Sequence, residues 1–206
     1  MTATLELGTP HGPARVHMHR VEGGGPRAGL VLGHGAGGGV TAGDLVTATR
    51  AALAEGVAVA LVEQPYRVAG RRSPAPARQL DAAWLAVVEQ LRAGELGGGV
   101  PLIAGGRSAG ARVACRTAAA TGAAGVLCLA FPVHPPGRPE KTRIAELDEV
   151  TVPALVVQGE RDPFGMPPEA QGRTIVRVDG DHGLRKEHSV IAAAIRDWLG
   201  DALAGS

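Results

Sequence analysis

The sequence has no long hydrophobic run and no excess of charge of one sign. No apolar stretch approaches the ~18–20 residues that are needed to span a bilayer. Residues 1–16 also lack the basic start and the long apolar segment of a signal peptide. The 21 basic and 20 acidic side chains nearly cancel and are interspersed, unlike the basic face of a nucleic-acid-binding protein. We therefore expect a soluble, cytoplasmic protein that binds neither membranes nor nucleic acids.

Cysteine is nearly absent as well, which argues against a cysteine-ligated metal site and against a disulfide-stabilised fold. Only Cys115 and Cys128 are present, and neither shows the CxxC or Cys/His spacing of a metal site. Both lie in apolar surroundings, so we expect two buried, reduced thiols in a reducing compartment. The sequence predicts no metal ion and no cofactor.

The rest of the composition is that of an ordinary globular protein. Hydrophobic residues make up 45% of the chain and charged residues 20%, and 206 residues are enough for one well-packed domain. The 31 glycines fall in short clusters between apolar runs, where they indicate turns and close backbone approaches. We find no linker, repeat or second domain, so residues 1–206 are predicted to form a single domain.

Short apolar runs recur along the chain and are predicted to be strands. Most of them are continuous rather than alternating, which is typical of strands covered on both faces in a parallel sheet. Residues 14–21 alternate instead and are predicted to form an antiparallel edge strand. The six apolar runs are 30–32, 57–62, 102–104, 126–129, 155–157 and 175–178.

Helical patterns occupy the segments between these runs. Residues 80–91 and 191–203 place apolar side chains at the spacing of a helix with one buried face. Residues 109–120 are small, so a helix there could pack closely against a sheet. The alternation of strand and helix predicts a doubly wound α/β domain with a mostly parallel sheet.

The strongest functional signal is the segment Gly-Arg-Ser-Ala-Gly at 106–110, centred on Ser108. It lies between a predicted strand and a predicted helix, which is the context that a nucleophile elbow requires. Such a turn strains the serine backbone and exposes the hydroxyl above the sheet. Flanking glycines prevent collisions with neighbouring backbone. An ordinary glycine-rich turn is the alternative interpretation.

His182, in the loop after the last predicted strand, is the candidate base for Ser108. The alternatives are His34, His134 and His188. They fall in a different loop, in a proline-rich turn and in the predicted final helix.

Asp162, just past the carboxyl end of the preceding strand, is the candidate acid that would fix the tautomer of His182. Glu160 is its main competitor, and Asp181 is too close in sequence to His182 to turn back on it easily. The order Ser, Asp, His along the chain is the one that an elbow-type triad follows.

The glycine-rich segment 33–38 follows the first central strand and would let backbone N–H groups face a carbonyl oxygen. The candidate donors of this oxyanion hole are the N–H groups of Ala36 and Ala109, each worth ~3–4 kcal/mol to the transition state. A phosphate-binding loop is the alternative, but the segment lacks the Lys-Ser/Thr of a P-loop and the full GxGxxG spacing.

Three of the five aromatic residues, Tyr66, Phe131 and Phe164, fall at or just beyond predicted carboxyl ends of strands. Sites of α/β proteins form at that edge. We therefore expect at least two of the three to line the pocket around Ser108. The alternative is that they cap the core.

The loop after the predicted strand at 57–62 carries Arg67, Arg71 and Arg72. Arg71 and Arg72 are candidates for binding a carboxylate or phosphate on the substrate, since a guanidinium is planar and permanently charged. The alternative is a solvated loop, with Arg107 paired to a nearby acid for structural reasons.

Taken together, these segments resemble the α/β-hydrolase fold, and in particular small proteins of the dienelactone-hydrolase-like type. Within that type the sequence is most similar to a branch that includes a testis-expressed protein and a subunit of a nonspecific-lethal histone acetyltransferase complex. The resemblance covers almost the whole chain after residue 25 and implies the same triad. Dienelactone hydrolases proper use a cysteine nucleophile where Ser108 stands here, so their substrate is not carried over. The supporting segments are HGAGGG at 34–39, EQPYRVAGRR at 63–72, GGRSAG at 105–110, FPVHPPGRPEK at 131–141, QGERDPFG at 158–165 and DGDHGL at 179–184.

The triad predicts a serine hydrolase that cleaves small, soluble carboxylic esters through an acyl-enzyme on Ser108. Its expected partner is therefore a small-molecule ester. A non-catalytic interaction module on a hydrolase scaffold is the alternative, since a fold does not imply a function. Between 134 and 152, where larger relatives insert a cap, the chain is short and rich in proline. We therefore expect no cap domain and a site that is open to water.

Overall fold

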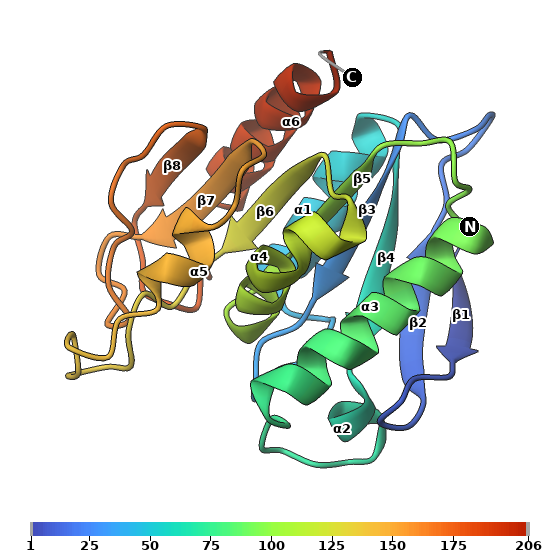
Figure 1. The fold of residues 1–206 in the computed structure, drawn as a ribbon. Coiled ribbons are helices and arrows are strands. Elements are labelled where there is room, and N and C mark those ends of the chain that lie inside the picture. The colour runs from blue at the N-terminus through green and yellow to red at the C-terminus, as the bar shows by residue number, and fades with distance from the viewer. Residues whose placement is uncertain (1, 205–206) are drawn as a thin grey trace.

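The computed structural model describes residues 2–204, which form one eight-stranded sheet with helices on both faces (Figure 1). The sheet order is β1-β2-β4-β3-β5-β6-β7-β8. The strands from β3 to β8 run parallel, whereas β2 pairs antiparallel with both β1 and β4. The strands are β1 (Thr2–Leu7), β2 (Ala14–His19), β3 (Ala28–Gly33), β4 (Val57–Glu63), β5 (Leu102–Arg107), β6 (Gly125–Leu129), β7 (Ala154–Gly159) and β8 (Arg173–Val178).

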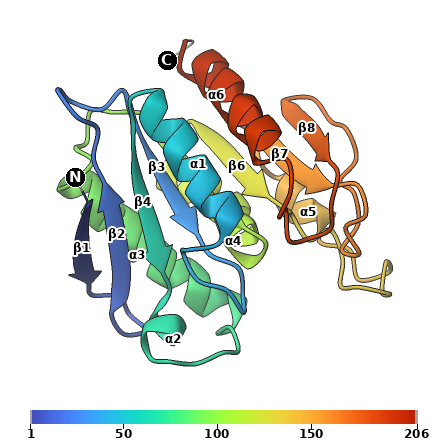
Figure 2. The same cartoon turned by 180° about the vertical axis from the view of Figure 1, so that it is seen from behind.

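The helices form two layers. α3, α4 and α5 cover the face of the sheet that is turned to the viewer in Figure 1, and α1 and α6 cover the opposite face, which Figure 2 shows. The helices are α1 (Gly43–Ala54), α2 (Pro65–Val68), α3 (Ala77–Ala93), α4 (Ala109–Thr121), α5 (Ile144–Asp148) and α6 (His188–Ala204).

Each face of the sheet carries its own apolar core, and β3 contributes to both. Val31 packs into the core under α3 and α4, whereas Leu30 and Leu32 pack into the core under α1 and α6. Successive side chains of a strand point to opposite faces, so a strand between two helical layers is buried at every position, as β3 is. This explains the continuous apolar runs, and the predicted doubly wound, mostly parallel α/β fold is confirmed.

The predicted edge strand is antiparallel, but it does not lie at the edge. β2 is covered by β1, whose side chains alternate between exposed and half-buried. The pattern of β1 is too weakly apolar to stand out, because only the face that carries Ala3, Leu5 and Leu7 packs against the core. The structure also contains α1 and α2, for which the apolar periodicity was not diagnostic.

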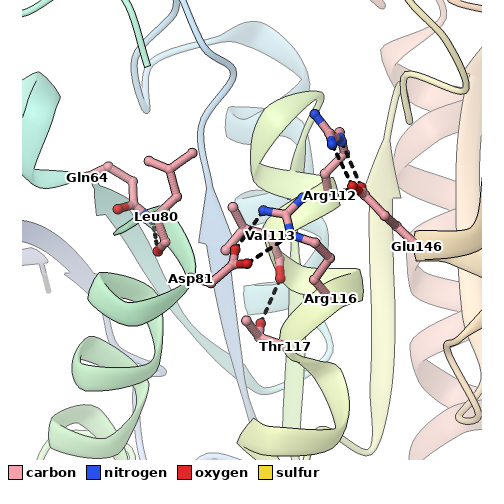
Figure 3. A network of polar contacts seen from close by, with 8 residues as sticks. All are labelled: Gln64, Leu80, Asp81, Arg112, Val113, Arg116, Thr117 and Glu146. Atoms are coloured by element: carbon pink, nitrogen blue, oxygen red, sulfur yellow. Dashed lines mark hydrogen bonds and ion pairs between the residues drawn. The ribbon is translucent and has the colours of Figure 1, made fainter. Parts of the chain in front are cut away.

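Ion pairs join the three helices of one layer, as Figure 3 shows. Arg116 of α4 pairs with Asp81 of α3 at 2.6 Å and with Glu146 of α5 at 3.2 Å. Arg112, one turn earlier on α4, pairs with the same Glu146 at 2.5 Å. These side chains are all more than half buried, so the network fixes α4 between its two neighbours.

Residues 2–204 include no cap domain. The connection between β6 and β7 contains only the five-residue helix α5, which is short for any covering element. Among residues 2–204, no helix is long and apolar enough to cross a membrane.

Candidate active site

Ser108 lies at a sharp turn between β5 and α4. Its backbone has φ 52° and ψ −108°, a conformation that costs a residue with a side chain roughly 1–3 kcal/mol. Glycine on both sides permits this turn. A Cβ at Gly110 would lie 2.3 Å from the carbonyl oxygen of Gly33, and one at Gly106 would lie 2.6 Å from the same oxygen. The start of α4 therefore packs directly on β3. This close packing places Ser108 at the carboxyl edge of the sheet.

The three residues predicted as a triad lie within hydrogen-bond distance of one another. His182 Nε2 lies 2.9 Å from Ser108 Oγ, and His182 Nδ1 lies 2.8 Å from Asp162 Oδ2. With a proton on Nδ1, the imidazole donates to the carboxylate and Nε2 accepts from the serine hydroxyl. The arrangement has the geometry in which a serine can lose its proton to a neighbouring base.

Asp162 is held by two further donors. Its Oδ1 accepts the N–H of Phe164 at 2.8 Å, and its Oδ2 accepts Nε2–H of Gln158 at 2.8 Å. The side chain is 1% exposed, so these bonds replace the water that a carboxylate would otherwise have. The Gln158 amide also donates to the carbonyl oxygens of Phe131 and Gly165, which ties the loops after β6 and β7 together.

The alternative acids and bases lie elsewhere. Glu160 and Asp181 are exposed, and the Asp181 carboxylate accepts the N–H of Gly183. His188 contacts Thr47 of α1 at 2.9 Å. His134 instead contacts the carbonyl of the next residue at 2.9 Å.

His34 and Tyr66 hold the glycine-rich loop after β3. Nδ1–H of His34 donates to the carbonyl of Gly35 at 2.8 Å, and its Nε2 accepts the N–H of Gln64 at 3.2 Å. The hydroxyl of Tyr66 donates to the carbonyl of Ala36 at 2.9 Å. These bonds engage the carbonyl oxygens of Gly35 and Ala36 and so fix the conformation of the loop. The first N–H groups of α4 have no partners within their own helix.

The aromatic candidates are placed in three different ways. Phe164 stacks on the imidazole of His182, with ring centroids 4.1 Å apart. Tyr66 lies beside the glycine-rich loop after β3, where it lines two adjoining cavities. Phe131 is fully buried in the core beneath α4, so it is not a cleft wall. Its position at a strand end was the same as that of the other two, but its side chain points into the helical layer.

The two cavities that share Tyr66 differ in size and position. The smaller, of about 10 Å³, touches Ala109. The larger, of about 90 Å³, reaches Arg71 and His11. Both arginines are exposed, but of the two only Arg71 is among the described residues that line one of these cavities.

Sequence reasoning missed two contributors to the site. Gln158 was a detectable signal, because it is a polar residue at the end of an apolar strand. The partner of Arg107 was not detectable: Arg107 pairs with Asp44 of α1 at 2.9 Å, and nothing near Asp44 in sequence indicates this contact.

Within residues 2–204, no group of three or more His, Cys, Asp or Glu side chains could hold a metal ion.

The fold and the site are those of the α/β hydrolases, and the comparison with known families agrees. Residues 26–193 match the family described as Alpha/beta hydrolase domain. The chain belongs to this family. No curated protein sequence matches it.

Solved structures with similar folds include a serine hydrolase without a lid from Xanthomonas campestris, at 22% identity and a TM-score of 0.76, covering 97% of this chain and 94% of that one. An alpha-beta serine hydrolase homologue from Coxiella burnetii is 18% identical, with a TM-score of 0.76 and coverage of 97% and 98%. A dienelactone hydrolase from Anabaena variabilis is 13% identical, with a TM-score of 0.74 and coverage of 98% and 97%. At these identities the likeness concerns the fold.

Proposed function

We propose that this protein is a serine hydrolase that cleaves small, soluble carboxylic esters through an acyl-enzyme on Ser108. The observation that supports it best is the continuous hydrogen-bonded chain from Ser108 through His182 to the buried Asp162. The alternative, a non-catalytic interaction module, gives no reason to keep a strained serine within 2.9 Å of an oriented imidazole.

In the proposed reaction, Ser108 Oγ attacks the ester carbonyl while His182 Nε2 takes the hydroxyl proton. The N–H groups of Ala36 and Ala109 stabilise the tetrahedral oxyanion. The C–O bond to the alcohol then breaks as His182 returns the proton to the leaving oxygen. Water, activated by His182 in the same way, attacks the acyl-enzyme and releases the acid. Asp162 holds His182 in the required tautomer throughout.

A fluorophosphonate probe tests the proposal on the purified protein. We expect covalent labelling and hydrolysis of p-nitrophenyl acetate, both abolished by Ser108→Ala, with a thermal midpoint close to that of the wild type. Ser73→Ala, in the exposed loop before α3, is the matched serine control and should leave both signals unchanged. A wild-type protein that is folded but neither labelled nor active would favour the interaction module.

We also propose that Arg71, rather than Arg72, recognises an anionic group on the substrate. The larger cavity extends from Tyr66 to Arg71 and His11 and has space for several water-sized groups. No carboxylate of residues 2–204 forms an ion pair with Arg71, so its guanidinium is available to a carboxylate or phosphate.

A matched pair of esters, p-nitrophenyl butyrate and p-nitrophenyl hemisuccinate, tests the role of Arg71. Arg71→Ala should reduce kcat/KM for the anionic ester about tenfold relative to the neutral one, which corresponds to about 1.4 kcal/mol. Arg72→Ala is the control and should change neither ratio. Equal effects of the two variants would mean that the loop acts only through its general charge.

Two finer proposals concern context. The free thiols of Cys115 and Cys128 are buried with their sulfur atoms 3.5 Å apart and not bonded, which supports a reducing, cytoplasmic location. The resemblance to the branch with the testis-expressed protein and the nonspecific-lethal complex subunit stays a proposal about ancestry, from which we take no substrate.

A further inference from the structure

The guanidinium of Arg107 lies where three parts of the site meet. Its Nε pairs with Asp44 Oδ2 at 2.9 Å, and its Nη2 donates to the carbonyl oxygen of His182 at 3.0 Å. A Cβ at Gly35 would lie 2.8 Å from Nη1, so the guanidinium also lies directly against the oxyanion loop. One side chain therefore contacts the start of α1, the loop that carries the base and the loop that carries the oxyanion hole.

Asp44 anchors this side chain. Its carboxylate is 1% exposed, and its Oδ1 accepts the N–H of Leu45 at 2.9 Å. Burial raises the pKa of Asp44, and the positive charge of Arg107 opposes that rise. A buried carboxylate needs an oppositely charged partner to remain ionised. The ion pair therefore holds the guanidinium in one place, and the rigid fork of its N–H groups sets the direction of the bond to His182.

We infer that Arg107 is a positioning residue that sets the orientation of His182 through the carbonyl oxygen of that residue, with Asp44 as its anchor. The inference rests on the proposed hydrolase function. Asp162 holds the imidazole at Nδ1, whereas Arg107 holds the backbone of the same residue. Because Arg107 directly precedes Ser108 in the chain, the same side chain fixes the base relative to the nucleophile.

A single conservative variant separates positioning from simple stabilisation. Arg107→Lys keeps a positive charge beside the buried Asp44, so the urea unfolding midpoint should stay close to that of the wild type and well above that of Arg107→Gln. A lysine ammonium on a flexible stem does not reproduce the fork that spans Asp44 and the carbonyl of His182. We therefore expect kcat for p-nitrophenyl acetate, and the rate of phosphonate labelling, to fall about 100-fold, the cost of misplacing a reacting group by ~1 Å, with KM nearly unchanged.

Two further variants protect the test against a folding defect. In Asp44→Asn/Arg107→Gln the buried charges are removed together, so stability should recover relative to Arg107→Gln while kcat stays low. Arg116→Gln removes the charge of an ion-paired arginine on α4 that does not contact the triad, and it should lower stability without changing kcat. If Arg107→Lys or the double variant recovers kcat together with stability, the positioning role is overturned.

A crystal structure of Arg107→Lys supplies a readout that does not need activity. We expect the loop at 179–184 to shift and His182 Nε2 to lie beyond hydrogen-bond reach of Ser108 Oγ. An unchanged triad would overturn the inference. A different outcome is that the wild type is inactive while His182 is displaced in the structure of Arg107→Lys. That outcome would contradict the proposed function and leave the positioning role supported.

Discussion

His34 shows how a residue outside the triad shapes the site. Its imidazole is buried and uses one nitrogen as a donor to Gly35 and the other as an acceptor from Gln64. Only the neutral form can do both, since protonated histidine has no acceptor. Burial also lowers the pKa of His34, and the nearby charge of Arg67 lowers it further. The conformation of the glycine-rich loop after β3 is thus coupled to the protonation state of one side chain.

This coupling predicts how stability depends on pH. Because the pKa of His34 in the folded protein is below the ordinary histidine value of about 6.5, the unfolded state binds more protons between the two pKa values. The contribution of His34 should be fully present above pH 6.5 and should decline as the pH falls below it. The measurement is the urea unfolding midpoint between about pH 5 and 8, where histidine titrates. As the pH falls, this midpoint should decrease less steeply for His34→Gln than for the wild type.

His19 provides the control for that measurement. Burial lowers its pKa as well, so it contributes with the same sign, but it lies at the end of β2 and not in the glycine-rich loop after β3. His19→Gln should flatten the pH dependence of stability without changing ester hydrolysis. His34→Gln should change both. If the urea midpoints of the wild type and of His34→Gln fall equally below pH 6.5, the predicted contribution of His34 to the pH dependence of stability is contradicted.

At the scale of elements, the contact of α4 with β3 decides whether Ser108 is presented at the sheet edge. Gly110→Ala should destabilise the protein by the upper part of the ~1–3 kcal/mol typical of overpacking, because its Cβ would overlap the backbone of Gly33. Gly200→Ala in α6 meets no atom within 4 Å and should instead stabilise by ~0.5–1 kcal/mol from helix propensity. Thermal or urea unfolding of the two variants measures the contrast.

The ion-pair network between α3, α4 and α5 makes a second element-scale prediction. Arg116→Ala should cost ~1.5–3 kcal/mol, as expected for hydrogen bonds to charged groups in partly buried surroundings, because Asp81 and Glu146 lose a shared partner. A double-mutant cycle with Asp81→Ala should give a coupling of ~0.5–3 kcal/mol. Arg177→Ala, whose pair with the exposed Glu169 spans 3.7 Å, should stay within ~0.5 kcal/mol. Equal costs for the two arginines would contradict the network.

At the scale of the whole molecule, the absence of a cap domain predicts the kinetics on lipid-like substrates. The connection between β6 and β7 carries only the five-residue helix α5, so no domain there has to open before an ester enters. We expect hydrolysis of short, soluble esters without a rate increase when a long-chain ester passes its micelle concentration. Initial rates measured across that concentration test this. A sharp increase in rate would mean that a segment of the chain closes over Ser108 in solution.

Much of the site could be predicted from local signals. Ser108, Asp162 and His182 each follow a strand in the expected order, and strand ends are recognisable from apolar runs and glycine. Phe131 shows the limit of such reasoning, because its position matched that of Phe164 while its side chain is buried beneath α4. A residue just past a strand end can face either layer of helices or the cleft. The path of the loop decides between them, and that path depends on the elements that pack against the loop.

The sequence alone determined the doubly wound α/β architecture and the spacing of the triad, because hydrophobic periodicity and turn chemistry act over a few residues. Tertiary structure decided what no local pattern contains. It placed β1 outside β2, put Arg71 in the lining of a cavity beside Tyr66, and brought Asp44 into contact with Arg107, which also binds the carbonyl oxygen of His182. Such contacts join segments far apart in the chain, and their stability comes from burial, which exists only once the sheet and both helical layers have assembled.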